Sequence, residues 1–433
     1  MPSGTSRQRY VWLALVALLG LGAAALRFET LGARELWYDE IYTDRICRAA
    51  ATLPDVWRVA AEDGWQHPPL HYALTFLALR LGDSLAYLRL PSALAGVAAV
   101  LLLAWLGRAL FGTRAGLAAG LLLATSVYHV AYSVDARPYA LLVALVVAQY
   151  LAFEVAARGR PLAWVLFVLS GSAALYTHHT ALVAEAGFGL LAAAGIAAAW
   201  RAGPPGAAAR RRALRAAAAP LAALAAIGFL YAPQLANLSQ FYALQIEAKH
   251  TLVLTPGLLR DVVARFGAGP GWPAALFSLA FLAGVVAILR RRDRSAGVLL
   301  FVVAPFLPYV LIPFSKFFDL RFAIVALPAF HLVVAAGVVF LGELVASGVR
   351  AVRGKAGACV APVAGALVVG ALVLPSLSAC ATFRTSRVLC GNFFLDPAIL
   401  DANGGFCRRH LILNSLADPS LLRARSAAPL RAN

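Results

Sequence analysis

Two adjacent carboxylates, Asp39 and Glu40, stand in the aromatic segment that follows the first long apolar run of the sequence. A carboxylate beside apolar walls is either kept charged by cations and hydrogen bonds or has its pKa raised by desolvation, and either state suits a proton acceptor. Acidic residues are also favoured in the first turn of a helix, where the helix dipole stabilises them. The pair therefore indicates either a catalytic base or the acidic start of a short helix.

Two later segments add a histidine and a charged pair. His67 precedes two prolines that suit the first turn of a short helix over 68–81. Its imidazole is expected either to bind an acceptor or a metal, or to pack against that helix. Asp135 and Arg137 stand in a short loop between two apolar runs, and such a loop needs neither charge. We expect Asp135 to orient Arg137 or an acceptor hydroxyl.

Several cations stand where helices are expected to reach the outer face of a membrane. They are Arg89, Arg137, Lys316 and Arg321. Such positions oppose the usual excess of basic residues on the cytoplasmic side. Each cation alone could bind lipid headgroups, and Lys316 and Arg321 could pair with Asp319. A converging set is better explained by an anion at the interface, such as a lipid phosphate.

A histidine pair and an acidic residue complete the polar set. His178 and His179 are expected in another outer loop, and Glu185 follows them within the next apolar run. An ionisable residue within a membrane span is a candidate functional residue. The histidines could bind a metal together with Asp39, Asp135 or His67, but neutral packing is an equal alternative. We therefore predict no metal site and no required cofactor, and leave open whether a divalent cation assists.

The elements that must position these residues are membrane-spanning helices. The chain has 433 residues, of which 61% are hydrophobic and 13% charged, and its mean hydropathy is +0.78. Soluble proteins carry about 25% charged residues, so a single water-soluble core is excluded. A span needs about 20 apolar residues. We place about eleven spans, at 10–27, 89–107, 115–132, 138–157, 162–176, 180–200, 216–232, 272–289, 296–314, 322–346 and 357–374.

Arginine-rich loops assign the sides of the membrane. The N-terminus and every second loop carry clusters of arginine, which are typical of the cytoplasmic side. These clusters account for most of the net charge of +18, so we predict a lipid bilayer and no nucleic acid as partner. The long outer loops are then 28–88 and 233–271, and the 68–81 helix is too short to cross. We expect short juxtamembrane helices in the first outer loop.

The C-terminal part is predicted to lie outside the spans. We divide the chain into a transmembrane domain, 1–374, and a periplasmic tail, 375–433. Cys47, Cys380, Cys390 and Cys407 all fall on the outer side, where disulfides form. We expect at least one bridge within the tail, and the sequence does not choose among the pairings.

The order of these segments resembles the GT-C glycosyltransferases, and in particular the branch of the protein O-mannosyltransferases and the lipid A aminoarabinose transferase. The matching segments are Asp39-Glu40, His67-Pro68-Pro69, Arg89-Leu90-Pro91-Ser92, Tyr132-Ser133-Val134-Asp135-Ala136-Arg137-Pro138-Tyr139, Tyr176-Thr177-His178 and Arg321 before Leu327-Pro328. The resemblance covers residues 36 to 330 and leaves the tail unmatched. This chain lacks the basic residue that some relatives carry soon after the acidic pair.

The resemblance implies an all-α integral membrane protein with the GT-C fold and an active site on the non-cytoplasmic face. It implies that Asp39 is the catalytic carboxylate, that Glu40 supports it, and that Arg89, Arg137, Lys316 and Arg321 bind the donor phosphate. His67, Asp135, Tyr139 and His178 are then expected to bind substrate. The implied enzyme is a hexosyl- or pentosyltransferase that uses a polyprenyl-phosphate sugar. Its acceptor would be an envelope glycan, lipid or protein.

The implied chemistry agrees with the residues. Inverting transfer needs one base for the acceptor hydroxyl, whereas the lipid phosphate leaves as a stabilised anion and needs cations instead of a general acid. We therefore expect a multi-pass protein of a bacterial inner membrane, with the N-terminus cytoplasmic and the C-terminus periplasmic.

Two other functions fit the spans. A transporter or flippase of a lipid-linked or small substrate would explain Glu185, but it predicts polar residues in mid-membrane, whereas most here stand at the outer ends of the spans. An acyl- or phosphoethanolamine-type transferase would use His178 and His179 at its centre.

Overall fold

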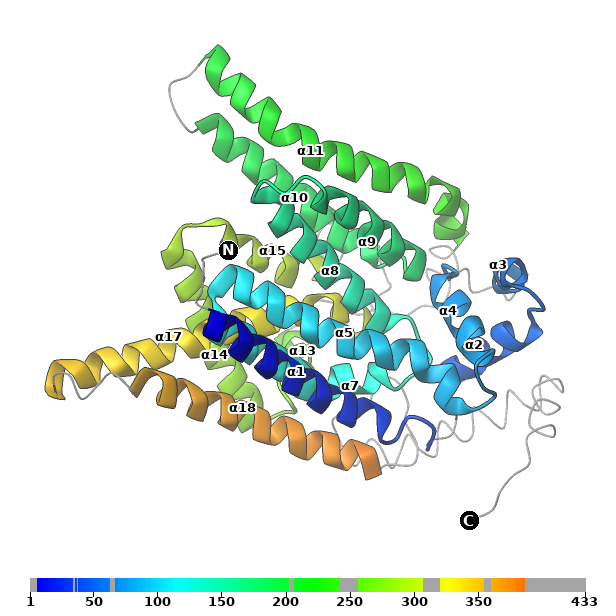
Figure 1. The fold of residues 1–433 in the computed structure, drawn as a ribbon, viewed down its shortest axis with the longest axis horizontal. Coiled ribbons are helices and arrows are strands. Elements are labelled where there is room, and N and C mark those ends of the chain that lie inside the picture. Colours follow the sequence, from blue (N-terminus) through cyan, green and yellow to red (C-terminus); the bar gives the residue numbers. More distant parts are fainter. Residues whose placement is uncertain are drawn as a thin grey trace.

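The fold is helical throughout the part of the chain that can be described. The computed structural model describes residues 6–33, 36, 38–62, 67–201, 206–240, 256–306, 320–353 and 360–385. These ranges contain α-helices and short 3-10 helices and no strand. Figure 1 shows the long helices side by side in one bundle. The predicted all-α membrane fold is confirmed.

Eight helical segments of the described ranges are long and apolar enough to cross a membrane. Six lie within α1 (Ser6–Phe28), α5 (Leu85–Phe111), α8 (Tyr139–Ala157), α10 (Ala181–Arg201), α14 (Trp272–Arg291) and α18 (Val360–Thr385). A seventh begins within α11 (Ala207–Tyr231) and continues to Gln240, and the eighth begins at Arg321 and runs into α17 (Leu327–Arg353). A ninth candidate is the pair α6 (Thr113–Thr125) and α7 (Val127–Ser133), which is bent by 62°.

The predicted count of eleven spans is not confirmed. The helix that corresponds to 162–176, α9 (Ala163–Thr177), has 15 residues, which is short for a span. Of the predicted span 296–314, only the part up to Phe306 is described, and there α15 (Gly297–Val303) lies between the 3-10 helices η2 (Arg294–Ala296) and η3 (Ala304–Phe306).

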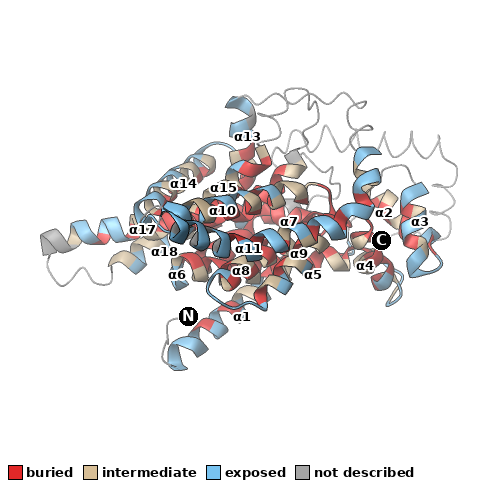
Figure 2. Ribbon diagram, turned by 90° about the horizontal axis from the view of Figure 1, so that it is seen from above, coloured by how far each residue is buried: buried red, intermediate tan, exposed pale blue. Residues whose placement is uncertain are grey.

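Burial separates a central helix from lipid-facing ones. In the apolar stretch of α17, 83% of the residues are buried, against 17% in α18 and 22% in the stretch that includes α11. Buried residues gather inside the bundle, and the exposed side chains of its surface include many leucines (Figure 2). Such a surface suits a hydrocarbon environment.

Two glycines let α14 and α17 touch along their backbones. A Cβ atom on Gly284 would lie 1.9 Å from the Val333 oxygen, and one on Gly337 would lie 1.8 Å from the Ala280 oxygen. Small residues at such a crossing are typical of helix packing in membranes. The two helices therefore pack closely, and α17 follows directly after η4 (Leu320–Ala326) in the chain.

Three short helices lie together at one end of the bundle (Figure 1). They are α2 (Tyr38–Ala49), α3 (Leu53–Glu62) and α4 (Leu70–Leu79). Ile46, Val56, Tyr72 and Phe76 form a small apolar core between them. The expected short helices of the first loop are therefore present, and α4 falls within the predicted 68–81.

The last described helix runs past the predicted end of the membrane domain. α18 continues through Pro375 to Thr385. Cys380 therefore lies in this helix, where it is buried and unbridged, and Cys47 is also buried and unbridged. Cys390 and Cys407 lie outside the described residues, and the expected bridge of the tail stays a prediction.

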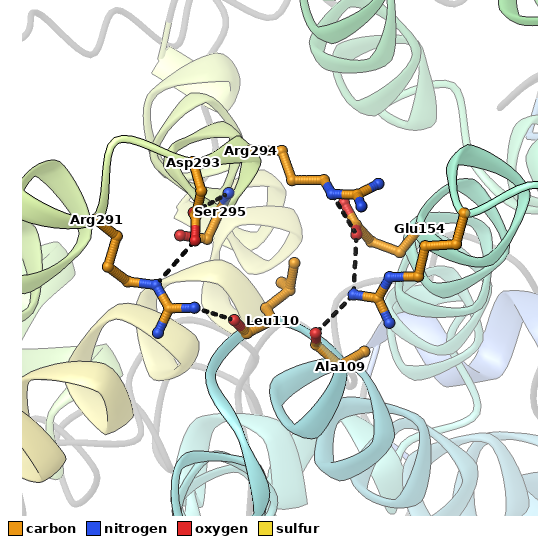
Figure 3. Close-up of polar contacts among 8 residues, drawn as sticks. Ala109, Leu110, Glu154, Arg291, Asp293, Arg294 and Ser295 are labelled. Carbon is orange, nitrogen blue, oxygen red and sulfur yellow. Dashed lines mark hydrogen bonds and ion pairs between the residues drawn. The ribbon is translucent and has the colours of Figure 1, made fainter. Parts of the chain in front are cut away.

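A group of charged residues, here called the Glu154 network, joins the C-terminal ends of α5, α8 and α14 (Figure 3). Arg158 Nη2 lies 3.4 Å from a carboxylate oxygen of Glu154, and Arg294 Nε lies 3.9 Å from it. Arg158 and Arg291 also donate to carbonyl oxygens in the last turn of α5. Cations are favourable at helix C-termini. The network comprises the charged side chains of Glu154, Arg158, Arg291, Asp293 and Arg294 and the backbone oxygens of Ala109 and Leu110.

Candidate active site

The first turn of α2 carries Asp39 between two arginines. Arg321 Nη1 forms an ion pair with Asp39 Oδ2, and Arg137 Nη2 lies 3.8 Å from the same oxygen. Arg137 Nη1 also donates to the backbone oxygen of Asp39 at 3.4 Å. The side chains of Asp39 and Arg321 are 18% and 22% exposed, so solvent reaches this carboxylate. The expected acidic helix start is present, because Asp39 lies in the first turn of α2. Asp39 also meets converging cations, and its role as a catalytic base stays a prediction.

Glu40 lies behind Asp39 in a buried ion pair. Arg89 Nε and Nη2 donate to its two carboxylate oxygens at 2.7 Å each, and the Ala136 N–H donates to Oε1 at 2.8 Å. The side chains of Glu40 and Arg89 are each 2% exposed. Arg89 Nη1 donates to the Leu31 oxygen at 3.0 Å. The geometry thus gives Arg89 a positioning role at Glu40, and its predicted contact with phosphate stays a prediction that this burial does not favour.

The turn between α7 and α8 presents Arg137. The backbone N–H of Arg137 donates to the backbone carbonyl oxygen of Asp135 at 2.8 Å. The Ser92 hydroxyl of α5 donates to the backbone carbonyl oxygen of Arg137 at 3.0 Å. Burial acts to lower the pKa of Arg137, but Asp39 outweighs it, and the pKa is raised above its ordinary value. Arg137 therefore stays a cation. Asp135 is buried and interacts electrostatically with Arg89.

An aromatic group adjoins Arg137 and Arg321. The ring of His178 lies 5.5 Å from that of His67, 5.4 Å from Tyr139 and 5.4 Å from Phe322, measured between ring centres. Burial, and then neighbours that include Arg137 and Arg321, hold the pKa of both histidines well below the ordinary range. Both imidazoles are therefore neutral at physiological pH.

The hydrogen bonds of His178 assign its tautomer. Its Nδ1 accepts from the Thr180 N–H at 3.1 Å and lies 2.9 Å from the Thr180 hydroxyl. A neutral imidazole that accepts at Nδ1 carries its hydrogen on Nε2. His178 is thus a hydrogen-bond donor at Nε2 and is unsuited to act as a general base.

Two hydrogen-bonding contacts that the sequence did not predict connect the His178 loop to α11. His179 Nδ1 lies 2.6 Å from the Tyr231 hydroxyl, and the Tyr176 hydroxyl donates to the Leu230 oxygen at 3.0 Å. Both partners come from the end of α11. The only signal in the sequence is a tyrosine at the end of the predicted span 216–232, and that signal is too weak to name a partner.

Within the residues that the structure describes, the remaining predicted residues are not found in contact with Asp39, Arg137 or Arg321. Lys316 and its possible partner Asp319 lie outside the described residues. Glu185 pairs with Gln149, whose Nε2 lies 2.9 and 3.0 Å from its two carboxylate oxygens. Across the described part of the chain, no three His, Cys, Asp or Glu side chains gather as metal ligands. Whether a divalent cation assists stays an open question.

A protein-family comparison matches part of the chain. Residues 66–202, less than half of the chain, match the family described as dolichyl-phosphate-mannose-protein mannosyltransferase. This match includes Arg89, Arg137 and His178 but not Asp39 or Arg321. No sequence among the curated proteins matches this chain significantly.

Two solved structures share the fold. ArnT from Cupriavidus metallidurans, bound to undecaprenyl phosphate, is 15% identical with a TM-score of 0.54, and the match covers 88% of this chain and 72% of ArnT. The oligosaccharyltransferase AglB from Archaeoglobus fulgidus, in complex with an inhibitory peptide and a dolichol-phosphate, is 15% identical with a TM-score of 0.56. That match covers 88% of this chain and 56% of AglB, so this chain spans little more than half of AglB. These findings confirm the resemblance to the GT-C glycosyltransferases and show the GT-C fold.

Proposed function

We propose that this protein is a membrane glycosyltransferase that moves a sugar from a polyprenyl-phosphate carrier to a hydroxyl group of an envelope glycan, lipid or protein. The transfer inverts the configuration at the sugar, and Asp39 is the general base. The bacterial inner membrane holds the protein with its N-terminus in the cytoplasm and its C-terminus in the periplasm, so that Asp39 faces the periplasm.

The observation that carries this proposal is the asymmetry of the Asp39 contacts. Arg137 and Arg321 both approach Oδ2, and within the described residues no hydrogen bond is donated to Oδ1. One carboxylate oxygen is thus fixed by cations, while the other is left to accept a proton. A base beside two cations is the set that transfer from a phosphate carrier requires.

The reaction moves charge toward those cations. The acceptor oxygen attacks the anomeric carbon of the sugar, and its proton passes to Asp39 Oδ1. The bond between that carbon and the phosphate oxygen breaks, and its electron pair stays on the phosphate. The carrier changes from a phosphodiester monoanion to a phosphomonoester with additional negative charge. Arg137 and Arg321 stabilise that charge as it forms.

The neighbouring side chains suit an uncharged, hydroxyl-rich group. His178 donates from Nε2, and Tyr139 and His67 offer rings and polar atoms beside it. We propose that these residues, with Asp135, bind the sugar or the acceptor. Lys316 remains a predicted further phosphate contact.

The relatives support the class of donor. The matched ArnT structure holds undecaprenyl phosphate, and the AglB structure holds a dolichol-phosphate and a peptide. The family that matches residues 66–202 is described by a dolichyl-phosphate-mannose donor and a protein acceptor. Both observations favour a lipid-phosphate carrier, and they leave the sugar and the acceptor to experiment.

The test is incubation of the purified protein with a panel of polyprenyl-phosphate sugars and a cell-envelope extract that supplies acceptor hydroxyl groups, followed by lipid extraction and mass spectrometry. Wild-type protein should convert one donor to the free polyprenyl phosphate, and Asp39→Asn should not. Asp293→Asn is a matched control, because this aspartate also pairs with an arginine but lies in the Glu154 network. Equal turnover by wild type and Asp39→Asn would refute the base assignment. Failure to bind or convert any carrier lipid would favour the transporter alternative.

A further inference from the structure

The break between α6 and α7 exposes the end of a helix inside the protein. α6 ends at Thr125, α7 begins at Val127, and the two axes differ by 62°. The last four carbonyl groups of a helix lack partners within that helix. In a membrane protein no bulk water reaches such groups, so each needs a partner from the protein.

Side chains of three helices supply those partners. The Thr125 hydroxyl donates to the Leu121 oxygen at 2.9 Å and lies 3.5 Å from the Leu122 oxygen. Arg27 of α1 donates to the Leu123 and Ala124 oxygens at 3.5 and 3.2 Å. The Cys380 thiol of α18 lies 3.2 Å from the Thr125 oxygen. Every carbonyl from 121 to 125 thus has a side-chain partner at the break.

Arg27 is central among these partners. Its side chain is fully buried, and no carboxylate of the described residues lies within ion-pair distance of it. A buried cation without a partner is costly. The negative end of the α6 dipole takes the place of the carboxylate. Arg27 Nη2 also lies 2.8 Å from His129 Nδ1, so the same guanidinium joins α7 to α1.

These contacts connect the two segments that carry the proposed reaction. In the chain, α1 is followed by α2, whose first turn carries Asp39, and α7 is followed by the turn that presents Arg137. The packing between α5 and Arg27 is tight. A Cβ atom on Gly96 of α5 would lie 2.2 Å from the Ser133 hydroxyl and 2.8 Å from Arg27 Nε.

We propose that Arg27 is a positioning residue, which fixes the α6–α7 break and thereby sets Arg137 against Asp39. The inference rests on the proposed glycosyl transfer only for its kinetic readout. Arg27 contacts neither Asp39 nor Arg137 among the described residues, so it acts through the placement of α7.

The kinetic test is a double-mutant cycle between Arg27→Met and Arg137→Gln. Arg27→Met should lower kcat/KM for the donor by about 100-fold, the loss expected for a displacement of about 1 Å at a reacting centre. Arg27→Lys retains the charge and should recover part of the loss. The losses from two independent residues add in free energy, whereas the losses from two coupled residues do not. Because Arg27 acts through Arg137, the double variant should lose much less kcat/KM than the product of the two single losses.

Gly96→Ala tests the same contact while Arg27 stays in place. Its methyl group pushes against Ser133 and Arg27, and we expect the same direction of change, a lower kcat/KM for the donor. Arg9→Met is the control on α1, because Arg9 is exposed and lies near the start of this helix, whereas Arg27 lies near its end. It should leave kcat/KM for the donor unchanged.

A measurement without turnover separates this inference from the proposed function. Hydrogen–deuterium exchange of the amides in residues 126–137 should increase in Arg27→Met and Gly96→Ala, while exchange in α8 stays as in wild type. Unchanged exchange in both variants would overturn the inference whatever the activity. Additive losses in the cycle would also overturn it, because the Arg27 effect would then be independent of Arg137. An inactive wild type with the expected exchange pattern would refute the proposed transfer and leave the positioning intact.

Discussion

Carboxylates meet arginines at several places in the protein, and two of these places differ in the exposure of their arginines and in sequence separation. In the Asp39 cluster (Asp39, Glu40, Arg89, Arg137, Arg321), partners are 49 to 282 residues apart, and the side chains are 2% to 22% exposed. In the Glu154 network, two of the pairs join residues two or four positions apart, and its arginines are 31% to 52% exposed, although the Glu154 side chain itself is 2% exposed.

The difference indicates two uses of the same residue types. The exposed Arg291–Asp293 pair joins sequence neighbours and contributes about 0–1 kcal/mol, and Arg158 and Arg291 also bind helix-end carbonyls. Its contacts suit the fixing of helix ends. The Asp39 cluster assembles buried charges from distant segments, at a desolvation cost that stability alone does not require. Such an arrangement is typical of a functional site.

Asp39→Asn should give the largest loss of activity. General-base catalysis contributes about 10²–10⁴-fold to a rate, so kcat for donor consumption should fall by that factor. The variant should still accumulate in the membrane, because asparagine preserves the shape of the side chain. Turnover measured by mass spectrometry checks this, and a loss of less than a few-fold would mean that another group accepts the proton.

Glu40→Gln should give the largest loss of stability. Removal of one partner of a buried ion pair costs about 3–5 kcal/mol, because the other charge stays buried. Thermal unfolding in detergent should therefore shift to much lower temperature. The double variant Glu40→Gln/Arg89→Met should be less impaired than the single one. A small shift for Glu40→Gln would show that water or another residue compensates Arg89.

Arg137→Gln and Arg321→Gln should each weaken donor binding. Loss of a charge-assisted contact costs about 1.5–3 kcal/mol, which corresponds to about 10–100-fold in donor KM. Steady-state kinetics with varied donor measure this. Arg294→Gln, from the Glu154 network, is the matched control and should leave donor KM unchanged. An unchanged KM for both Arg137→Gln and Arg321→Gln would reduce these residues to structural partners of Asp39.

Acid should destabilise the protein through the histidines beside the Asp39 cluster. Burial, and then nearby cations, lower the pKa of His67 and His178 in the folded state. The unfolded chain takes up protons near its ordinary pKa of about 6.5. Stability should therefore be complete above that pH and fall as the pH drops below it toward the folded-state values.

Unfolding temperatures between about pH 7.5 and 5 measure this loss. His178→Gln should reduce the slope with pH. The same slope in wild type and variant would place the acid sensitivity at other groups.

Arg291→Gln should have the smallest effect. The side chains of Arg291 and Asp293 are both nearly half exposed, so the pair contributes about 0–1 kcal/mol. Transfer rate and unfolding temperature should remain close to wild type. A large loss of activity would break the distinction between the two regions.

Local patterns predicted the elements well. The adjacent carboxylates do begin a helix, the two prolines do precede α4, and nearly every predicted span contains a helix. Hydropathy and helix-start signals depend on residues close in sequence, and this is why they succeed. The span count was less secure, because the bend after Thr125 and the short α9 depend on packing against other helices.

The pairings within the site could not be predicted. The sequence indicated that Arg89, Arg137 and Arg321 gather near Asp39, but not that Arg89 belongs to Glu40 while the other two share one oxygen of Asp39. Partner choice depends on the relative heights and rotations of helices, which the packing determines. Arg27 was predicted only as the end of a span, because its partners are backbone oxygens that carry no sequence signal.

The Asp39–Arg321 ion pair has a consequence for the time course of synthesis. Its two residues are 282 positions apart. At about 5–20 residues per second, a ribosome needs about 15–60 s to travel from one to the other. During that interval Asp39 is already made while one of its two cations is missing. The proposed catalytic centre is therefore completed only late in translation, and a nascent chain that stalls before η4 displays the carboxylate without that donor-binding arginine.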